Sequence, residues 1–432
     1  MASQTARRDR TRPDVSRRQF LGTATAALGV GAVTPFSSTA AAAQPDVSAL
    51  EAKLGDNIFT RRFGIRPHLP AHPNITQLSG IRLAPEVTDA MLEANEYFVN
   101  MADLIEAAGR RVAEVTGAEA GLVSAGAASG LLLGAAACLT GTDRERMSAL
   151  PHPTWERREC VIQSVSRTRY SQAFQAAGMT IVEVETREQL LSALGDRTAM
   201  IAGTAGVERQ RQSGPPVPKH RATDWGPEVM RPQELVDIGK RVGVPVLIDA
   251  APDVPPVENL TRFIAMGADL VAMSGGKGLQ GPQSTGLLAG RADLIEAARM
   301  QNAPNDGIGR GMKVAKEEIV GFIVALDRFA ARDHAAVRAA VNRRAQWVAG
   351  ELQGIPGLTA TYALNTVDLG VIELTWDENV IPLTAQALRA ELMDGEPRVI
   401  IFRNYVWTQN LRDGEDVLVA RRLREVFTRA RG

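Results

Sequence analysis

Short apolar segments alternate with helical periodicity through the middle of the chain. Segments with the length of a buried strand lie at 121–124, 160–163, 181–184, 200–202, 246–248 and 270–273. Stretches with apolar residues at helical spacing lie between or after them, at 131–139, 171–177, 188–194, 232–241 and 260–266. Strands that alternate with helices are typical of a mostly parallel sheet with helices on both faces. The pattern therefore predicts an α/β domain around such a sheet.

The pattern changes on both sides of this region. Residues 44–84 are rich in proline and lack periodicity, which predicts an extended N-terminal arm. Helical periodicity begins at Pro85 and continues to Ile105. The C-terminal part shows helical stretches and short apolar runs, at 317–329, 335–352, 370–374 and 399–402. We therefore expect an arm over 44–84, a large domain over 85–303 and a small α+β domain over 304–432.

The first 43 residues have the three parts of an export signal. A basic run leads into Ser16-Arg17-Arg18-Gln19-Phe20-Leu21, an apolar stretch rich in Gly and Ala follows, and small residues end it at 38–43. The Ser-Arg-Arg-x-Phe-Leu run resembles a twin-arginine signal. This resemblance implies export to the periplasm or the cell exterior, and a disordered basic tail is the alternative. The stretch is too short and small-sided to predict a membrane span.

Composition favours a globular enzyme with a small-molecule substrate. Lys and Arg total 49, as do Asp and Glu, so no net charge attracts nucleic acid or an anionic membrane. Hydrophobic residues make up 45% of the 432 residues, enough for a large core and a second domain. Cys138 and Cys160 lack the spacing of a zinc site or redox pair, so we expect core cysteines and no metal.

A carboxylate and a lysine occur where two neighbouring strands of the predicted sheet end. Asp249 terminates the apolar run at 246–248, and Lys277 follows the run at 270–273 within Ser274-Gly275-Gly276-Lys277. Their separation of 28 residues is one strand-to-strand crossover, so both side chains should reach the same edge of the sheet, where ligands bind. Taken alone, Asp249 could instead be an aspartate that caps a turn, and Lys277 could be a solvated lysine.

A small-residue segment between a strand and a helix predicts a phosphate site. Gly126, Ala127 and Ala128 precede the helix that begins near Leu131, and unpaired amides at a helix N-terminus attract anions. The alternative is a helix start that packs tightly. Ser274 could add a hydroxyl donor. A phosphate cradle, a carboxylate for a pyridine nitrogen and a Schiff-base lysine follow one another in this order along the chain, and together they predict pyridoxal phosphate (PLP) as cofactor.

Several segments resemble one group of PLP enzymes. The likeness spans about residues 81–329 and rests on 112–119, 140–143, 263–269, 274–277, 281–283 and 308–318. These resemble the selenocysteine-synthase-like branch of the fold-type-I PLP enzymes, and within it the relatives similar to D-glucosaminate-6-phosphate ammonia-lyase. The resemblance implies Lys277 as Schiff-base lysine, Asp249 at the pyridine nitrogen, and a homodimer or larger assembly with its site at the subunit interface.

Two departures from the family pattern concern the cofactor ring and the substrate. Ser166-Arg167 stands where relatives have a His-Arg pair, so the ring-stacking histidine is absent. Arg167 could stack on the pyridine through its flat guanidinium, or the site has diverged. In the arm, residues 68–74 differ from the Asn-Ala-x-Gly type segment that relatives carry.

These observations predict an exported PLP enzyme that acts at Cα of an amino acid or amino-sugar acid. We expect a lyase that expels ammonia or a β-substituent, with Lys277 as general base and Arg310 as a candidate ligand of the substrate carboxylate. A surface arginine that joins two domains is the alternative for Arg310. An aminotransferase, a racemase and a selenium-transferase-like enzyme are the alternatives within enzymes, and a catalytically silent PLP-binding protein is the alternative from another class.

Overall fold

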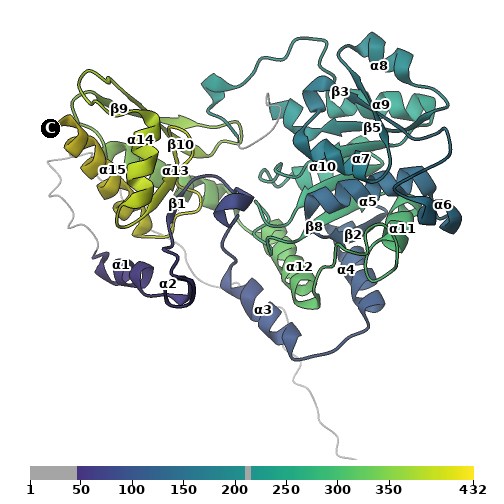
Figure 1. The fold of residues 1–432 in the computed structure, drawn as a ribbon, viewed down its shortest axis with the longest axis horizontal. Helices are drawn as coiled ribbons and strands as arrows, with labels where there is room; N and C mark the ends of the chain where they lie inside the picture. The colour runs from purple at the N-terminus through teal and green to yellow at the C-terminus, as the bar shows by residue number, and fades with distance from the viewer. Residues whose placement is uncertain (1–45, 210–215) are drawn as a thin grey trace, which may run out of the picture. The chain divides into compact units, whose positions relative to one another are not determined.

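The structure, a computed structural model, describes residues 46–209 and 216–432 (Figure 1). The predicted export signal at 1–43 lies outside the described residues, and the prediction stays untested. Within the two described ranges, no helix is long and apolar enough to cross a bilayer.

A seven-stranded sheet forms the centre of the larger part. Its strands, in spatial order, are β2 (Ala120–Ser124), β8 (Gly286–Gly290), β7 (Leu270–Ser274), β6 (Val246–Asp249), β5 (Thr198–Thr204), β3 (Glu159–Gln163) and β4 (Thr180–Val184). Only β8 pairs antiparallel with its neighbours, so the prediction of a mostly parallel sheet is confirmed. Strand β8 was not predicted, because a short run bounded by glycines carries no pattern that separates a strand from a loop.

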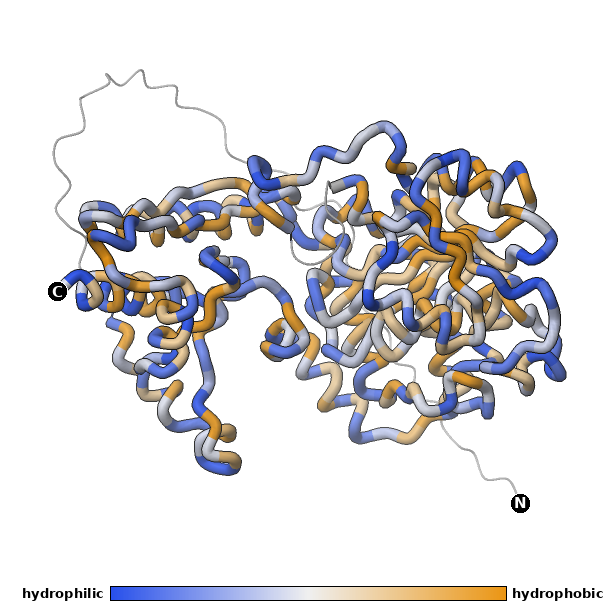
Figure 2. Tube along the Cα trace, turned by 45° about the horizontal axis from the view of Figure 1, so that its top comes forward, coloured by the Kyte–Doolittle hydropathy of each residue, from blue (hydrophilic) through white to orange (hydrophobic). Residues whose placement is uncertain are grey.

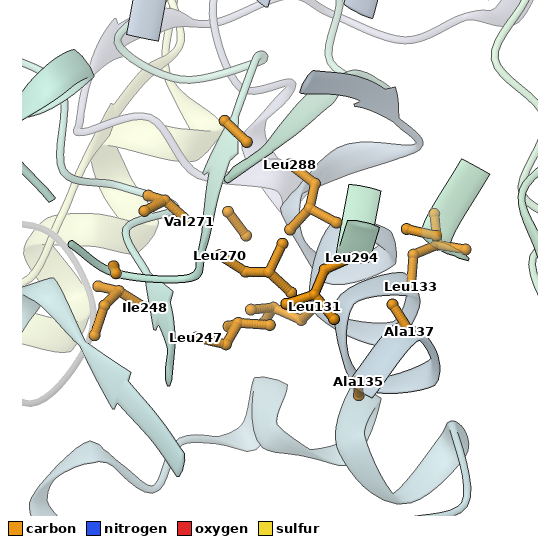
Figure 3. Close-up of a cluster of buried hydrophobic side chains, with 14 of the residues drawn as sticks. Leu131, Leu133, Ala135, Ala137, Leu247, Ile248, Leu270, Val271, Leu288 and Leu294 are labelled. Atoms are coloured by element: carbon orange, nitrogen blue, oxygen red, sulfur yellow. The ribbon is translucent and has the colours of Figure 1, made fainter. Parts of the chain in front are cut away.

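Helices cover this sheet, and all of them except α6 and α11 correspond to helical stretches predicted from the sequence. They are α4 (Met101–Thr116), α5 (Gly126–Thr140), α6 (Arg144–Ala149), α7 (Gln172–Ala176), α8 (Arg187–Ala193), α9 (Pro232–Val242), α10 (Asn259–Met266) and α11 (Ala292–Gln301). Helix α5 is buried almost throughout, and Figure 3 shows its Leu131 and Leu133 among the leucines of the sheet and α11. Figure 2 shows the same concentration of hydrophobic residues along the central strands.

The helical periodicity predicted from Pro85 to Ile105 corresponds to two helices. Helix α3 (Pro85–Asn95) ends before an irregular segment at 96–100, and α4 begins where the Asn100 side chain accepts a hydrogen bond from the Ala102 amide. An Asn side chain at that position caps a new helix and so separates it from the preceding one. The side chain of Phe98, between the helices, is fully exposed.

A second core forms around elements from both ends of the chain. A three-stranded antiparallel sheet has the order β12 (Tyr405–Trp407), β10 (Gly370–Trp376) and β9 (Leu358–Leu364). Strand β1 (Leu69–Ala71) of the arm pairs in parallel with β11 (Val399–Ile401). The helices of this part are α13 (His334–Glu351), α14 (Ala385–Asp394) and α15 (Glu415–Arg431). Leu69 and Ala71 are fully buried in this second core.

The arm and the junction of the two cores hold further helices. The arm contains α1 (Ser48–Gly55) and α2 (Ile58–Phe63), which the proline-rich pattern does not predict. Helix α12 (Lys316–Ala331) packs against α3 and α4 and contributes Phe322 and Phe329 to the first core. The chain passes to the second core between α12 and α13, and the domain boundary at residue 303 stays a prediction.

Candidate active site

The carboxyl edge of the central sheet gathers the predicted cofactor residues. Asp249 is the last residue of β6 and pairs with Ala272 of β7. Ser274 and Ser124 both pair with Gly286 of β8, so the ends of β2 and β7 lie at the same edge as Asp249. Ligands of parallel α/β sheets bind at this edge.

A cavity of about 590 Å³ opens at this edge and is lined by both Asp249 and Lys277. Its walls come from the sheet edge, from the arm at 73–77 and from the second core. The second core contributes, among others, Phe402 and Arg403. Asp249 and Lys277, which the spacing of the strands predicts at one edge of the sheet, lie in the walls of one cavity.

Asp249 is held in one orientation by the turn that follows its strand. Its Oδ1 accepts a hydrogen bond from the Ala251 amide at 3.0 Å, so the turn-capping alternative describes part of what this carboxylate does. On the neighbouring strand, the Thr204 hydroxyl donates to the Asp249 carbonyl at 3.3 Å and also lines the cavity. Asp249 therefore lies in the cavity wall with one carboxylate oxygen bound to this turn.

Lys277 lies in a glycine-rich turn that packs too tightly for side chains. A Cβ at Gly278 would lie 1.9 Å from the Val254 carbonyl oxygen, and a Cβ at Gly276 would lie 2.5 Å from the Gln283 Cα. Backbone atoms on both sides therefore fix the course of the chain around Lys277. Such a turn holds the lysine at the cavity with little freedom.

The start of α5 fits an anion. Its N-cap residue, Ala125, supplies no capping hydrogen bond, and Gly126 has a φ of 77°. Within the first turn, the buried Ser129 hydroxyl has no hydrogen-bond partner among the described residues. Free first-turn amides and an unsatisfied buried hydroxyl together fit a phosphate group. Gly126, Ala127, Ala128 and Ser274 are not among the residues that line the cavity itself.

Arg167 lines the cavity and directly follows the short 3-10 helix Ser164–Ser166, which comes after β3. Its guanidinium lies 3.5 Å from Glu183 and donates to the Gln175 side chain at 3.4 Å. Ser166 is buried and ends a short 3-10 helix. An arginine therefore lies at the cavity, whereas Ser166 before it has no aromatic ring that could stack on a cofactor.

Arg310 lies outside this cavity. Its exposed side chain is 3.5 Å from Asp306 within the loop that follows α11. Arg403, which the sequence analysis missed, lines the cavity from the turn between β11 and β12. Its φ of 57° is uncommon for a residue with a side chain, and such strained positions cluster at functional sites. No sequence signal marks it, because its position depends on how the second core packs.

Two histidines of the arm, the half-buried His68 and the buried His72, form a pair next to the cavity wall. The Nε2 atoms of His68 and His72 lie 2.9 Å apart, and His72 Nδ1 donates to the Pro73 carbonyl at 2.7 Å. His72 Nε2 must then accept from His68. Burial, followed by the neighbouring His72, lowers the pKa of His68 to about 4. The pair is therefore neutral near pH 7 and fixes the arm just before its cavity-lining residues.

Among the described residues, no group of three or more His, Cys, Asp or Glu side chains is arranged to hold a metal ion. The charged side chains that line the cavity are carboxylates, guanidinium groups and one lysine. Such a site can hold an anionic cofactor and an amino-acid-like substrate, and it can move a proton at Lys277.

Comparisons with known proteins agree with this chemistry. A 5'-C-glycyluridine monooxygenase-decarboxylase of a Streptomyces species is 34% identical over 354 residues, 79% of this chain and 83% of that protein. The D-glucosaminate-6-phosphate ammonia lyase of Salmonella typhimurium is 29% identical over 393 residues, 87% of this chain and 99% of that protein. A solved structure of D-glucosaminate-6-phosphate ammonia-lyase has a TM-score of 0.74 at 27% identity and covers 87% of this chain and 99% of its own.

A more distant relative covers part of the chain. The L-seryl-tRNA(Sec) selenium transferase of Solidesulfovibrio magneticus is 29% identical over 213 residues, 44% of this chain and 42% of that protein. No family model matches.

Proposed function

The chain belongs to the selenocysteine-synthase-like group of fold-type-I PLP enzymes, and we propose that it uses PLP to break a bond at Cα of an amino acid or amino-sugar acid. We propose further that it is a lyase that releases ammonia or a β-substituent. The observation that carries the proposal is the single cavity whose walls contain both Lys277 and Asp249 at the carboxyl edge of the sheet.

Each predicted cofactor residue has a place in this proposal. Lys277 would bond the cofactor covalently, Asp249 would hold the pyridine nitrogen protonated, and the amides of Gly126, Ala127 and Ala128 would bind the phosphate. The unsatisfied Ser129 hydroxyl supports the phosphate assignment. Bound PLP would supply an electron sink that weakens the bonds at Cα.

Ser274 and Arg167 are the remaining residues that we assign to the cofactor. Ser274 ends β7 at the same sheet edge and would add a donor to the phosphate. Arg167 would lie against the pyridine ring in place of the absent histidine, because its planar guanidinium can stack on an aromatic ring.

The chain's own groups would orient the substrate and move its proton. Lys277 would accept the proton from Cα as general base. Arg403 lines the cavity and would bind the substrate carboxylate through two parallel hydrogen bonds. The same role for Arg310 would require a second subunit, because its own chain's cavity does not include it.

Oxidative decarboxylation is a second candidate function. The relative at 34% identity is named a monooxygenase-decarboxylase, whereas the ammonia lyase is 29% identical. In that reaction the bond between Cα and the carboxylate would break and molecular oxygen would be consumed. The same Lys277 and Asp249 would serve, so residue assignments do not separate the two reactions.

One experiment separates these reactions. The enzyme is incubated with amino acids and amino-sugar acids in deuterated water, with oxygen uptake and carbon dioxide measured alongside. Ammonia and a keto acid without an acceptor indicate a lyase, inversion alone a racemase, and a need for a keto acid an aminotransferase. Oxygen uptake with carbon dioxide release indicates decarboxylation. Bound PLP with neither exchange nor products would favour the silent PLP-binding protein.

Borohydride reduction tests the lysine assignment independently. Reduction should fix the cofactor to one peptide that contains Lys277, and the Lys277→Ala protein should give no labelled peptide. Label on Lys313 or Lys316 would contradict the assignment of the cofactor site.

We propose that the protein forms a homodimer and is exported by the twin-arginine route. Support for the dimer comes from exposed apolar side chains at 92–99, where Leu92, Tyr97 and Phe98 are 69%, 61% and 100% exposed. Contiguous apolar surface on a soluble protein commonly marks an interface. Support for export comes from the pattern of residues 1–43.

A further inference from the structure

A smaller chamber of about 120 Å³ adjoins the cavity. The two spaces share lining residues from several parts of the chain: Asn74, Pro255, Gly278, Val367, Leu369 and Gln409. Because Gly278 directly follows Lys277, the chamber lies beside the segment that carries this lysine. Its remaining walls come largely from the junction of α12 and α13.

Arg332 presents a guanidinium group to this chamber and is held there by neutral partners. Its Nη1 donates to the Gln280 side-chain oxygen at 3.3 Å, and its Nε donates to His334 Nδ1 at 3.4 Å. The opposite nitrogen of His334 donates to the Phe329 carbonyl at 2.8 Å. The Arg332 guanidinium also lies 4.4 Å from the centre of the Phe329 ring.

No acidic side chain in the part of the chain that the structure describes pairs with Arg332. Among the described residues, no carboxylate lies within ion-pair distance of it, and its Nη2 makes no hydrogen bond. Burial, and after it the neighbouring Arg328, lowers the pKa of Arg332 to about 10. The exposed Glu258 is the one carboxylate among the lining residues and makes no ion pair with Arg332.

The backbone at Gln280 is strained in a way that keeps its oxygen between two arginines. Gln280 has a φ of 62°, and its side-chain oxygen accepts from both Arg328 and Arg332. Residues other than glycine adopt this region at a cost, and the surrounding structure must hold them there. The turn therefore holds one neutral acceptor beside Arg332 and leaves its charge available to an anion in the chamber.

The chamber has room for one small anionic group. One water molecule takes about 30 Å³ in the liquid, so about four fit, which is close to the five heavy atoms of a phosphate. Apolar side chains, among them Ile81, Val337 and Val341, form other parts of the wall. A desolvated guanidinium in such surroundings binds an anion more strongly than one in water.

We propose that this chamber binds an anionic group, a phosphate or a carboxylate, on the part of the substrate distant from Cα, with Arg332 as the main donor. The proposal rests on the proposed function, because it takes the reacting carbon to lie at Lys277. It assigns the substrate class as amino acids whose side chain ends in an anion.

Titration of the PLP-loaded protein with anions tests whether the chamber binds them. The cofactor's own phosphate then occupies the proposed phosphate site at the start of α5, so this site does not contribute to the binding that is measured. Inorganic phosphate and acetate are titrated separately by calorimetry at low ionic strength. Tighter binding of phosphate would identify a phosphorylated side chain, and tighter binding of acetate a carboxylated one. Absence of binding for both anions would overturn the proposal.

Two arginines give matched variants. Arg332→Gln should weaken anion binding by at least about tenfold, because a hydrogen bond to a charged group is lost. Arg332→Lys keeps the charge and should retain part of the binding, which covers the case in which the glutamine variant unfolds. Arg328→Gln is the control, since Arg328 also contacts Gln280 but lies 3.4 Å from Glu86 and outside the chamber lining.

The outcomes separate this proposal from the proposed function. Unchanged anion binding in Arg332→Gln, or an equal loss in Arg328→Gln, would overturn the assignment of the chamber even if Lys277 carries the cofactor. If borohydride labels another lysine, the proposed function fails while the titration still reports on Arg332. With a substrate in hand, Arg332→Gln should raise KM for the anionic compound and leave KM for an analogue without the anion unchanged.

Discussion

Gly286 packs against the start of α5, and a methyl group at this position should displace the backbone of the proposed phosphate site. A Cβ at this position would lie 2.6 Å from the Gly126 carbonyl carbon and 2.7 Å from the Ala127 amide nitrogen. These are backbone atoms, so no side chain can rotate away. Ordinary contact begins at 3.4 Å, so the helix start would have to move by about 0.8 Å.

The Gly286→Ala change should therefore reduce both stability and cofactor affinity. Overpacking of this kind costs about 1–3 kcal/mol in the free energy of unfolding. Displacement of the first-turn amides should weaken at least one hydrogen bond to the phosphate, which corresponds to about a tenfold or larger rise in the Kd for PLP. Urea unfolding of the cofactor-free protein measures the first effect, and equilibrium dialysis against PLP measures the second.

Gly134→Ala is the matched control in the same helix. Its Cβ would also meet an atom at 2.6 Å, but that atom is the flexible end of Leu247 in the core. We expect this variant to lose stability and to keep its affinity for PLP. If Gly286→Ala binds PLP as well as the wild type, or if Gly134→Ala loses as much affinity, the start of α5 is not the phosphate site.

Further predictions concern the ring nitrogen, the arm, the assembly and the export signal. Asp249→Asn should reduce kcat by orders of magnitude and Kd for PLP much less, because an amide cannot hold the pyridine nitrogen protonated; near-normal turnover would make this carboxylate structural. The pKa of His68 is lowered to about 4, so its contribution to stability is present above pH 6.5 and is lost as the pH falls toward 4. The full pKa shift corresponds to about 3 kcal/mol of stability, and partial exposure of the ring reduces this to about 1–2 kcal/mol. In urea unfolding, the stability of His68→Gln should therefore depend less steeply on pH over this range than that of the wild type. An equal dependence would refute the assignment of this pH effect to His68. Phe98→Glu should convert a dimer into monomers in light scattering, whereas an unchanged mass would exclude this segment from the interface. Arg17→Lys with Arg18→Lys should retain the protein in the cytoplasm in cell fractionation and leave PLP binding intact, and undiminished export would refute the twin-arginine route.

The parts of the site that follow from local sequence were predictable. Asp249 and Lys277 end or follow apolar runs, and adjacent parallel strands bring such ends to one edge of a sheet. Gly126 to Ala128 could be placed for a similar reason, since they separate a strand from a helix. These positions depend on the order of elements and need no knowledge of how distant segments pack.

The parts that depend on distant packing were not predictable. Arg403 lines the cavity from the turn between β11 and β12, whereas Arg310, the arginine selected from the sequence, lies outside the cavity of its own chain. Arg332 was likewise missed, because its surroundings combine the turn at Gln280 with the junction of two long helices. Nothing in the local pattern distinguishes these arginines from those on the surface.

The pairing of β1 with β11 affects when the protein can finish folding during its synthesis. Leu69 pairs with Val399, so about three-quarters of the chain must be made between the two partners. At about 5–20 residues per second, β1 waits for roughly 20 to 60 s. During that time its buried residues have no native partner, and chaperones can bind them. The second core is therefore completed only near or after the end of translation, and a ribosome stalled before residue 399 would leave the arm open to protease.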